Sequence, residues 1–256
     1  MMIADVVRAL AIPPNACIDQ RVPKKMLMEQ GAPTQADKKK IQDGIEDMFW
    51  IAALKPSNVA VPIYRDELRE YLEIAVISAT LRPKAKASRL VELIHRSIPY
   101  PAVLLSAQAE TVTISLAHKR HSLGEAGQVV IDGDIVAVDI SEESVLETTF
   151  LTSLTVAKQP AANLYALYQS WINRTEELLA ARITGHYVSS EAMNDVAARK
   201  ESIKDNEKIQ RELAVLRVAA LKEKQLNRRV EINLKIKRLE VELNAKINLL
   251  RLGEKK

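Results

Sequence analysis

Hydrophobic residues in the first 140 positions alternate between helical and extended spacing. Apolar residues at 3–10 predict a short helix, which ends before Pro13 and Pro14. Thr34 is followed three residues later by Asp37, an acidic variant of the capping box, and predicts the start of a second helix that runs to Pro56. Further segments are predicted as a helix at 85–97 and as strands at 22–28, 59–63, 71–81, 103–107, 111–118, 129–131 and 135–140.

The connections between the later strands favour hairpins. A short polar link joins 103–107 to 111–118, and Asp132-Gly133 has the composition of a type I′ turn between two apolar segments. Helices and strands are therefore mixed along the chain. The sequence predicts an α/β (α+β) body over residues 1–140, with a mixed, largely antiparallel sheet and packed helices, not a doubly wound parallel one.

No strand pattern follows residue 141. Residues 142–157 and 161–183 predict two helices, which we expect to form a helical extension over 141–185 that packs on the body. Residues 191–250 then contain neither Gly nor Pro, and a continuous helix of that length would extend roughly 90 Å. We therefore expect a long basic C-terminal helix over 191–252, resembling a coiled coil, that projects from the body or pairs with another helix.

The long C-terminal segment carries two apolar seams that are out of phase with each other. The change of phase falls between residues 221 and 230. Pairing in a coiled coil or in a helical hairpin is favoured, and a bent helix lying back on its own body is the alternative. The residues of this helix-pairing seam are Ile209, Leu213 and Leu216, then Ile232, Ile236, Leu239 and Leu243.

Composition places the chain among proteins of reducing compartments. Of its 256 residues 47% are hydrophobic, enough for a core, and Cys17 is the only cysteine, so no disulfide can form within the chain. No apolar run approaches the roughly 20 residues that span a bilayer, and Asp5 and Arg8 interrupt the N-terminal apolar stretch. We expect a cytoplasmic protein with no membrane partner.

The formal net charge of +4 is unevenly distributed. Residues 191–256 hold 17 Lys and Arg against 11 Asp and Glu, whereas residues 1–190 hold 20 against 22. The basic excess therefore belongs to the C-terminal segment, and this asymmetry favours an anionic partner there.

Seven basic residues stand close together in that segment. On a helix they could neutralise phosphates along a nucleic acid, or they could be the solvated flank of a coiled coil. No aromatic residues lie among them, so stacking on single-stranded bases is not expected. They are Lys222, Lys224, Arg228, Arg229, Lys235, Lys237 and Arg238.

A second basic group lies in the body, at the predicted ends of a helix and a strand. In one interpretation its members form a rim that binds a phosphate or an acidic protein surface. In the other, Arg96 and Arg120 pair with carbonyls or acids of the body, and His118 makes a buried polar contact. The residues are His95, Arg96, His118, Lys119 and Arg120.

Motifs of common enzymes are absent from the sequence. It contains no glycine-rich nucleotide loop, no H-E-x-x-H and no G-x-S-x-G, so we predict no catalytic residues, no cofactor and no metal. A restriction-type nuclease would need a lysine two residues after Glu73, where Ala75 stands. A degenerate metal-dependent nuclease around Glu73, with Asp66 or Glu67 nearby, remains the enzymatic alternative.

Several strings along the chain resemble an uncharacterised bacterial family that is labelled only as a domain of unknown function. They are VPKK at 22–25, DKK at 37–39, REYLEI at 69–74, IHR at 94–96, SLAHKR at 115–120 and EKQLNRRVE at 223–231. The resemblance supplies no activity. It implies a genomic context, beside helicases and DNA methyltransferases in restriction-like, anti-phage defence loci.

The leading hypothesis is a non-enzymatic accessory or scaffold subunit of such a DNA-targeting complex. Its body would bind a helicase- or methyltransferase-type partner, and its tail would reach another subunit or DNA. The alternatives are the degenerate nuclease and a stand-alone homodimer whose tails pair with each other.

Overall fold

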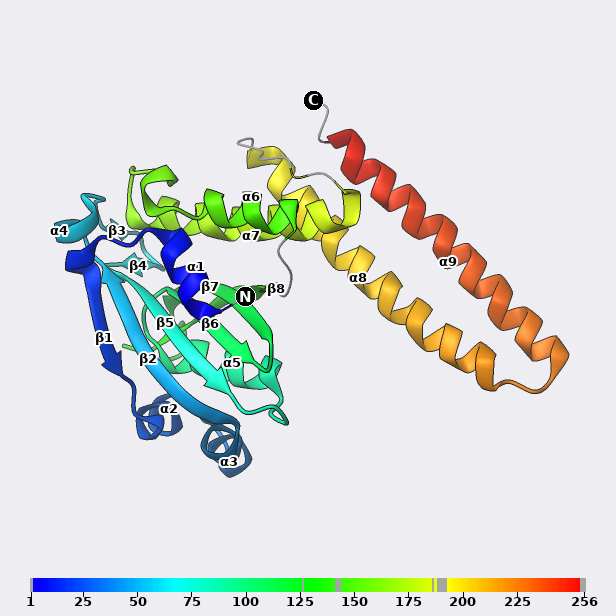
Figure 1. The fold of residues 1–256 in the computed structure, drawn as a ribbon, viewed down its shortest axis with the longest axis horizontal. Coiled ribbons are helices and arrows are strands. Elements are labelled where there is room, and N and C mark those ends of the chain that lie inside the picture. The colour runs from blue at the N-terminus through cyan, green and yellow to red at the C-terminus, as the bar shows by residue number, and fades with distance from the viewer. Residues whose placement is uncertain (1, 126, 141–143, 186, 188–192, 254–256) are drawn as a thin grey trace. The chain divides into compact units, whose positions relative to one another are not determined.

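The computed structural model describes all residues except 1, 126, 141–143, 186, 188–192 and 254–256. The chain forms two compact units, residues 1–175 and 176–256. The first is built on a six-stranded sheet, and the second consists of helices (Figure 1).

The six-stranded sheet is mixed and mostly antiparallel. β5 and β6 are parallel and are joined through α5 (Ala87–Ser97), whereas every other neighbouring pair is antiparallel. This confirms the predicted class of sheet. The strands, in their order across the sheet, are β1 (Cys17–Arg21), β2 (Ile45–Leu54), β5 (Ile74–Leu81), β6 (Ala102–Gln108), β7 (Thr111–His121) and β8 (Val129–Ile140). A separate small sheet pairs β3 (Tyr64–Arg65) with β4 (Glu70–Tyr71).

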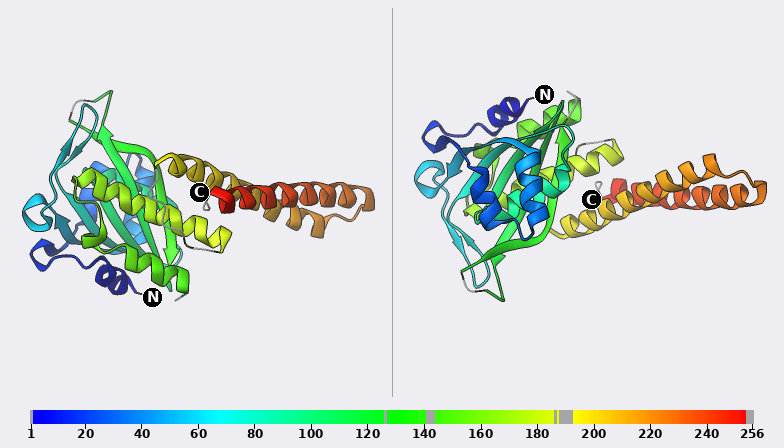
Figure 2. Two further views of the ribbon diagram at one scale, coloured as in Figure 1. Left: turned by 90° about the horizontal axis from the view of Figure 1, so that it is seen from above. Right: turned by 90° about the horizontal axis from the view of Figure 1, so that it is seen from below.

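Helices cover both faces of this sheet (Figure 2). On one face α2 (Lys24–Gln30), α3 (Gln35–Gly44) and α5 share a core with alternate residues of β5, including Ala75 and Ile77. The other face is covered by α1 (Ile3–Leu10), α6 (Val145–Ser153) and the first part of α7 (Leu164–Thr184). Because β5 is buried from both sides, it reads as an almost continuous apolar run. Three short helical turns complete the unit: η1 (Pro14–Ala16), α4 (Pro56–Val59) and η2 (Val156–Lys158).

The helix predicted from Thr34 to Pro56 is only half correct. Thr34 caps α3 as expected, because its side-chain oxygen accepts the Asp37 N–H at 3.1 Å. The chain then leaves the helix at Gly44 and forms β2. Two register shifts in the pairing of β2 with β5 displace its buried positions, so they recur at intervals that imitate a helix.

Other corrections also follow from local backbone geometry. The strand predicted at 22–28 is wrong because α2 begins directly after Pro23. The strand predicted at 59–63 is also wrong, since Val59 ends α4 and residues 60–63 form neither helix nor strand. The turn predicted at Asp132-Gly133 is absent, since β8 runs continuously through it. Gly133 has φ +80°, close to where the pairing of β7 and β8 shifts register, so this glycine serves a bulge.

The C-terminal unit contains a helical hairpin in place of one long helix. α8 (Met193–Lys222) and α9 (Leu226–Gly253) are separated by three residues, within the segment where the two apolar seams change phase. Arg217 pairs with Glu240 at 2.8 Å and Lys246 pairs with Asp205, so the helices run antiparallel. Among the described residues, no helix is long and apolar enough to cross a membrane.

The close approach of α2 to α5 yields a stability prediction. Gly31 ends α2, and a Cβ there would lie 2.8 Å from the Leu93 carbonyl oxygen and closer still to the Ser97 hydroxyl. Gly31→Ala should therefore lower the free energy of unfolding by about 1–3 kcal/mol in urea denaturation. Gly124→Ala is the control, since nothing lies within 4 Å of a Cβ there. Equal stability of the two variants would show that the helices do not meet at Gly31.

Candidate functional site

The basic residues predicted in the tail extend from the turn of the hairpin to the middle of α9. Lys222 ends α8, Lys224 lies in the connection and the other five lie on α9. All seven side chains are exposed. In the part of the chain that is described, none pairs with a carboxylate; the nearby Glu223 accepts the Gln225 N–H at 2.9 Å instead. We call these seven residues the hairpin stripe: Lys222, Lys224, Arg228, Arg229, Lys235, Lys237 and Arg238.

The predicted helix-pairing seam is placed between the two helices of the same chain. Ile209 and Leu213 are buried, and Leu216 and the four seam residues of α9 (Ile232, Ile236, Leu239 and Leu243) are half-buried. The seam is thus occupied without a partner chain. A second set of apolar residues on α9 remains exposed at four-residue spacing, namely Leu226, Val230 and Leu234.

A hollow of about 490 Å³ lies along the hairpin between α8 and α9. Arg217, Arg229 and Asn233 provide its polar lining, and Ala220, Leu221 and Ile236 its apolar lining. The Arg217 guanidinium is held by Glu240, whereas that of Arg229 has no acidic partner among the described residues. Arg229 therefore keeps its hydrogen-bond donors available for an anion.

The basic rim predicted in the body is not a continuous exposed surface. His95 and Lys119 do come together, but both are buried, with exposed fractions of 0% and 2%. The Lys119 ammonium donates to the His95 backbone carbonyl inside the unit. These two residues cannot meet an external phosphate, because the sheet and α5 enclose them.

Burial without a carboxylate changes the protonation of both groups. It lowers the pKa of Lys119 to about 7, since a charged ammonium is poorly solvated there. Burial, together with the positive charge of Lys119, lowers the pKa of His95 to about 3. The neutral His95 ring places Nε2 3.0 Å from the Ser115 hydroxyl oxygen, and its Nδ1 has no hydrogen-bond partner in the described structure.

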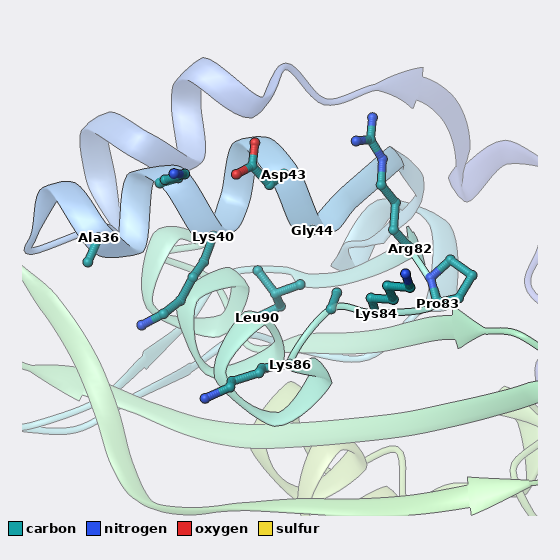
Figure 3. Close-up of a pocket in the computed structure, with 11 residues that line it drawn as sticks. Ala36, Lys40, Asp43, Gly44, Arg82, Pro83, Lys84, Lys86 and Leu90 are labelled. Atoms are coloured by element: carbon teal, nitrogen blue, oxygen red, sulfur yellow. The ribbon is translucent and has the colours of Figure 1, made fainter.

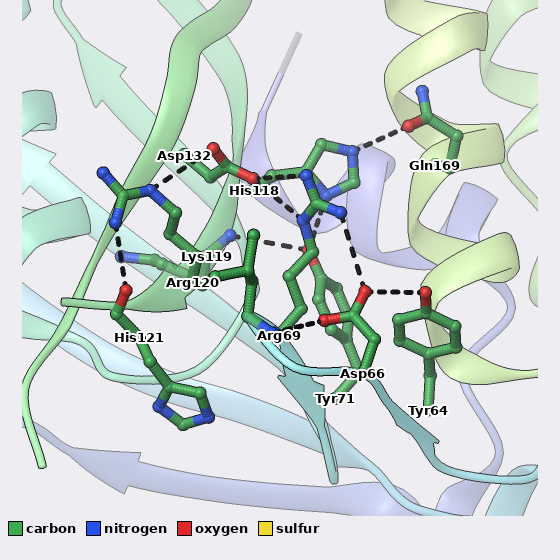
Figure 4. Close-up of polar contacts among 11 residues, drawn as sticks. Tyr64, Asp66, Arg69, Tyr71, His118, Lys119, Arg120, His121, Asp132 and Gln169 are labelled. Carbon is green, nitrogen blue, oxygen red and sulfur yellow. Dashed lines mark hydrogen bonds and ion pairs between the residues drawn. The ribbon is translucent and has the colours of Figure 1, made fainter. Parts of the chain in front are cut away.

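His118 belongs to a hydrogen-bonded chain beneath α7 (Figure 4). Its Nδ1 lies 2.5 Å from the Tyr71 hydroxyl oxygen, and its Nε2 lies 2.8 Å from the Gln169 amide oxygen. Because that oxygen can only accept, Nε2 carries the proton and Nδ1 accepts from Tyr71. Tyr165 stacks on the ring at a centroid distance of 5.0 Å. His118 thus makes an internal polar contact.

The two arginines of the predicted rim have acidic neighbours. Arg96 pairs with Glu92 at 2.8 Å, and Arg120 Nε lies 3.6 Å from the carboxylate of Asp132. Asp132 also binds Arg69 at 2.8 Å (Figure 4). Each of the five rim residues thus has a partner within the sheet unit, although the Arg96 side chain itself is exposed.

The residues considered for a nuclease do not form a metal site. Glu73 pairs with Lys55 at 2.9 Å, and Asp66 accepts the Tyr64 hydroxyl at 2.8 Å as well as two backbone N–H groups. Within the described ranges, no three His, Cys, Asp or Glu side chains lie close enough together to hold a metal ion.

A basic pocket that sequence reasoning missed lies between α3 and the segment that leads from β5 into α5 (Figure 3). It has a volume of about 720 Å³. The spacing R-P-K-A-K at 82–86 was a visible signal, but the second wall, at 39–40, belongs to a different element. Only the fold brings the two together. The charged lining consists of Lys39, Lys40, Arg82, Lys84 and Lys86 with a single acid, Asp43.

The buried Lys119 predicts a pH-dependent stability. Between its folded pKa of about 7 and its ordinary value of 10.5, the unfolded chain binds a proton that the folded chain does not. The free energy of unfolding should therefore rise with pH across this window, by at most about 1.4 kcal/mol per pH unit from this group. Lys119→Met should remove that rise in denaturation series at several pH values. Lys25→Met, at an exposed lysine, should retain it; a rise that persists in Lys119→Met would contradict the assignment.

Comparison with known proteins identifies a family but no described relative. Neither a curated protein nor a solved structure matches the chain. The family model for a domain of unknown function, DUF4391, matches residues 10–243 and so covers both the sheet unit and most of the hairpin. The chain therefore belongs to the DUF4391 family.

Proposed function

We propose that the protein is a non-enzymatic binding subunit that contacts the phosphate backbone of nucleic acid through the hairpin stripe. The observation that supports this most is the combination of seven exposed cations with no acidic partner among the described residues. A hairpin whose apolar seam is already covered can present these charges without a partner helix.

The dimensions of the stripe suit a short length of nucleic acid. Arg228 and Arg238 are ten residues apart, which corresponds to roughly 15 Å along a helix. Phosphates follow one another at about 3.4 Å per strand along the duplex axis, so about four fall within this length. Neutralising four phosphates gives a slope of log affinity against log salt of about −4. Binding of this kind carries no sequence preference, because charge contacts position a duplex without reading its bases.

A protein partner completes the proposal. The predicted genomic context suggests an accessory subunit of a DNA-targeting, anti-phage complex with a helicase- or methyltransferase-type subunit. The exposed residues Leu226, Val230 and Leu234 offer apolar contacts for such a subunit beside the stripe. They also favour one alternative, a homodimer of hairpins, which differs from the proposal in its mass in solution.

Charge reversal within the stripe tests the nucleic-acid contact. Arg228→Glu with Arg229→Glu should weaken duplex binding at least about tenfold and flatten the salt slope, because repulsion replaces two phosphate contacts. Fluorescence anisotropy with labelled duplexes of unrelated sequence, at several salt concentrations, measures both effects. Circular dichroism should show unchanged helicity, since both side chains are exposed.

A matched control separates the stripe from net charge alone. Lys25→Glu with Arg65→Glu changes the charge by the same amount at exposed positions of the sheet unit. This control should bind DNA nearly as well as the original chain. If both double variants lose binding equally, the stripe has no special role. If the stripe variant binds DNA normally but fails to bind its protein partner, the stripe is a protein-docking surface.

A further inference from the structure

The basic pocket gathers positive charge on the sheet unit. Its lining carries five cations and one carboxylate, Asp43, a balance equal to the net +4 of the whole chain. Residues 1–190 together contain more acidic than basic residues. Four of the five cations, at positions 39, 82, 84 and 86, are exposed and have no acidic partner in the described structure. Among the described residues only Asp43 in the lining offsets their mutual repulsion, as expected of a surface that receives an anion.

A network around Asp37 fixes the two helices that form the walls. Asp37 accepts both Nε and Nη2 of Arg89, at 3.1 and 2.7 Å, and so ties α3 to α5. The same carboxylate accepts Lys40 Nζ at 2.9 Å. Hydrogen bonds from Arg89 and Lys40 hold the pKa of Asp37 well below its usual range, so the ties persist in mild acid. Lys40 keeps two further donors for a ligand.

Hydrogen bonds also fix the segment that connects β5 to α5. The side-chain amide of Gln108, at the end of β6, donates to the carbonyls of Arg82 and Ala85 at 2.9 Å and to that of Pro83 at 3.3 Å. The Arg82 N–H in turn donates to the Gly44 carbonyl at 2.8 Å. The backbone that carries three of the cations is therefore preorganised, which reduces the entropic cost of binding.

The inner wall of the pocket is apolar. Buried Leu90 and half-buried Ala85 line it beside Gly44, and the exposed residues Ala36 and Pro83 lie at its edges (Figure 3). A Cβ at Gly44 would lie 2.7 Å from Leu90 Cδ1, so the missing side chain lets α3 and α5 approach at this point. A volume of about 720 Å³ falls within the usual range for pockets that hold a small organic ligand. A bare inorganic anion would leave most of this space unfilled.

We propose that this pocket binds the phosphate group of a nucleotide, with the base or sugar against the apolar wall. The cations at its opening hold the phosphate, and the first turn of α5 adds no acidic residue to oppose it. The nucleotide is either free or the 5′-terminal residue of a nucleic acid strand, because both present the same phosphate monoester. This site does not depend on the hairpin stripe.

Titration calorimetry of the full chain with adenosine 5′-monophosphate, adenosine and inorganic phosphate tests the pocket. The monophosphate should bind at least about tenfold more tightly than either fragment, since it alone satisfies both the cations and the apolar wall. Lys84→Ala with Lys86→Ala should weaken its binding by about tenfold or more, and Lys84→Arg with Lys86→Arg should restore most of it. Lys25→Ala with Arg65→Ala, at exposed positions outside the pocket, should have no effect.

Short single strands with and without a 5′ phosphate distinguish the two sources. Tighter binding of the phosphorylated strand than of the free nucleotide assigns the pocket to strand ends, and the reverse order assigns it to free nucleotides. Using the hairpin variant Arg228→Glu with Arg229→Glu as the background weakens contacts of the stripe with the strand's phosphate backbone in this comparison. The proposal is overturned if the 5′ phosphate makes no difference to either ligand, or if the Lys84 and Lys86 alanine variant binds as the unaltered chain does.

Discussion

The pairing of α8 with α9 determines what the C-terminal unit can offer to another molecule. Apolar seams on both helices must be removed from water, and a three-residue connection allows each helix to cover the other. Ion pairs from Arg217 and Lys246 fix the antiparallel register. Once the seam is covered internally, the charged residues of the stripe must lie outside it. The proposed phosphate contact is therefore a consequence of the hairpin.

The basic side chains of this protein have three kinds of surroundings. In the interior of the sheet unit, Lys119 pairs with no carboxylate of the described residues, and burial lowers its pKa to about 7. At the surface of the same unit, Arg69, Arg96 and Arg120 are matched with acids. The stripe and the basic pocket differ from both, because their cations are exposed and mostly unmatched among the described residues. Unmatched, solvent-exposed cations gathered on one surface are the arrangement that anionic ligands require.

The sequence was sufficient for features that depend on neighbouring residues. The Thr34 cap, the hairpin of β6 and β7 and the mixed class of the sheet all followed from local spacing. The sequence-based predictions failed where pairing between strands altered the spacing of buried residues. The bulges of β2 give its buried residues a helix-like spacing, and Gly133 lies in a bulge although its sequence context is typical of a turn.

The candidate sites also divide into those that neighbouring residues in the sequence reveal and those that only the fold reveals. The stripe was visible because its residues adjoin one another in sequence, whereas the basic pocket was not, because α3 and the segment before α5 meet only in the fold. For the predicted rim, the sequence offered internal contacts of Arg96, Arg120 and His118 as one interpretation, but it could not reveal that His95 and Lys119 are buried.

Lysine reactivity in the presence and absence of duplex DNA tests the central claim most directly. Acetylation of the full chain, followed by mass spectrometry of its peptides, reports each lysine separately. Contact through the stripe predicts that bound DNA protects Lys222, Lys224, Lys235 and Lys237, while Lys24 and Lys25 on α2 react as before. Unchanged reactivity of the four hairpin lysines under conditions where DNA is bound would contradict the proposed interface.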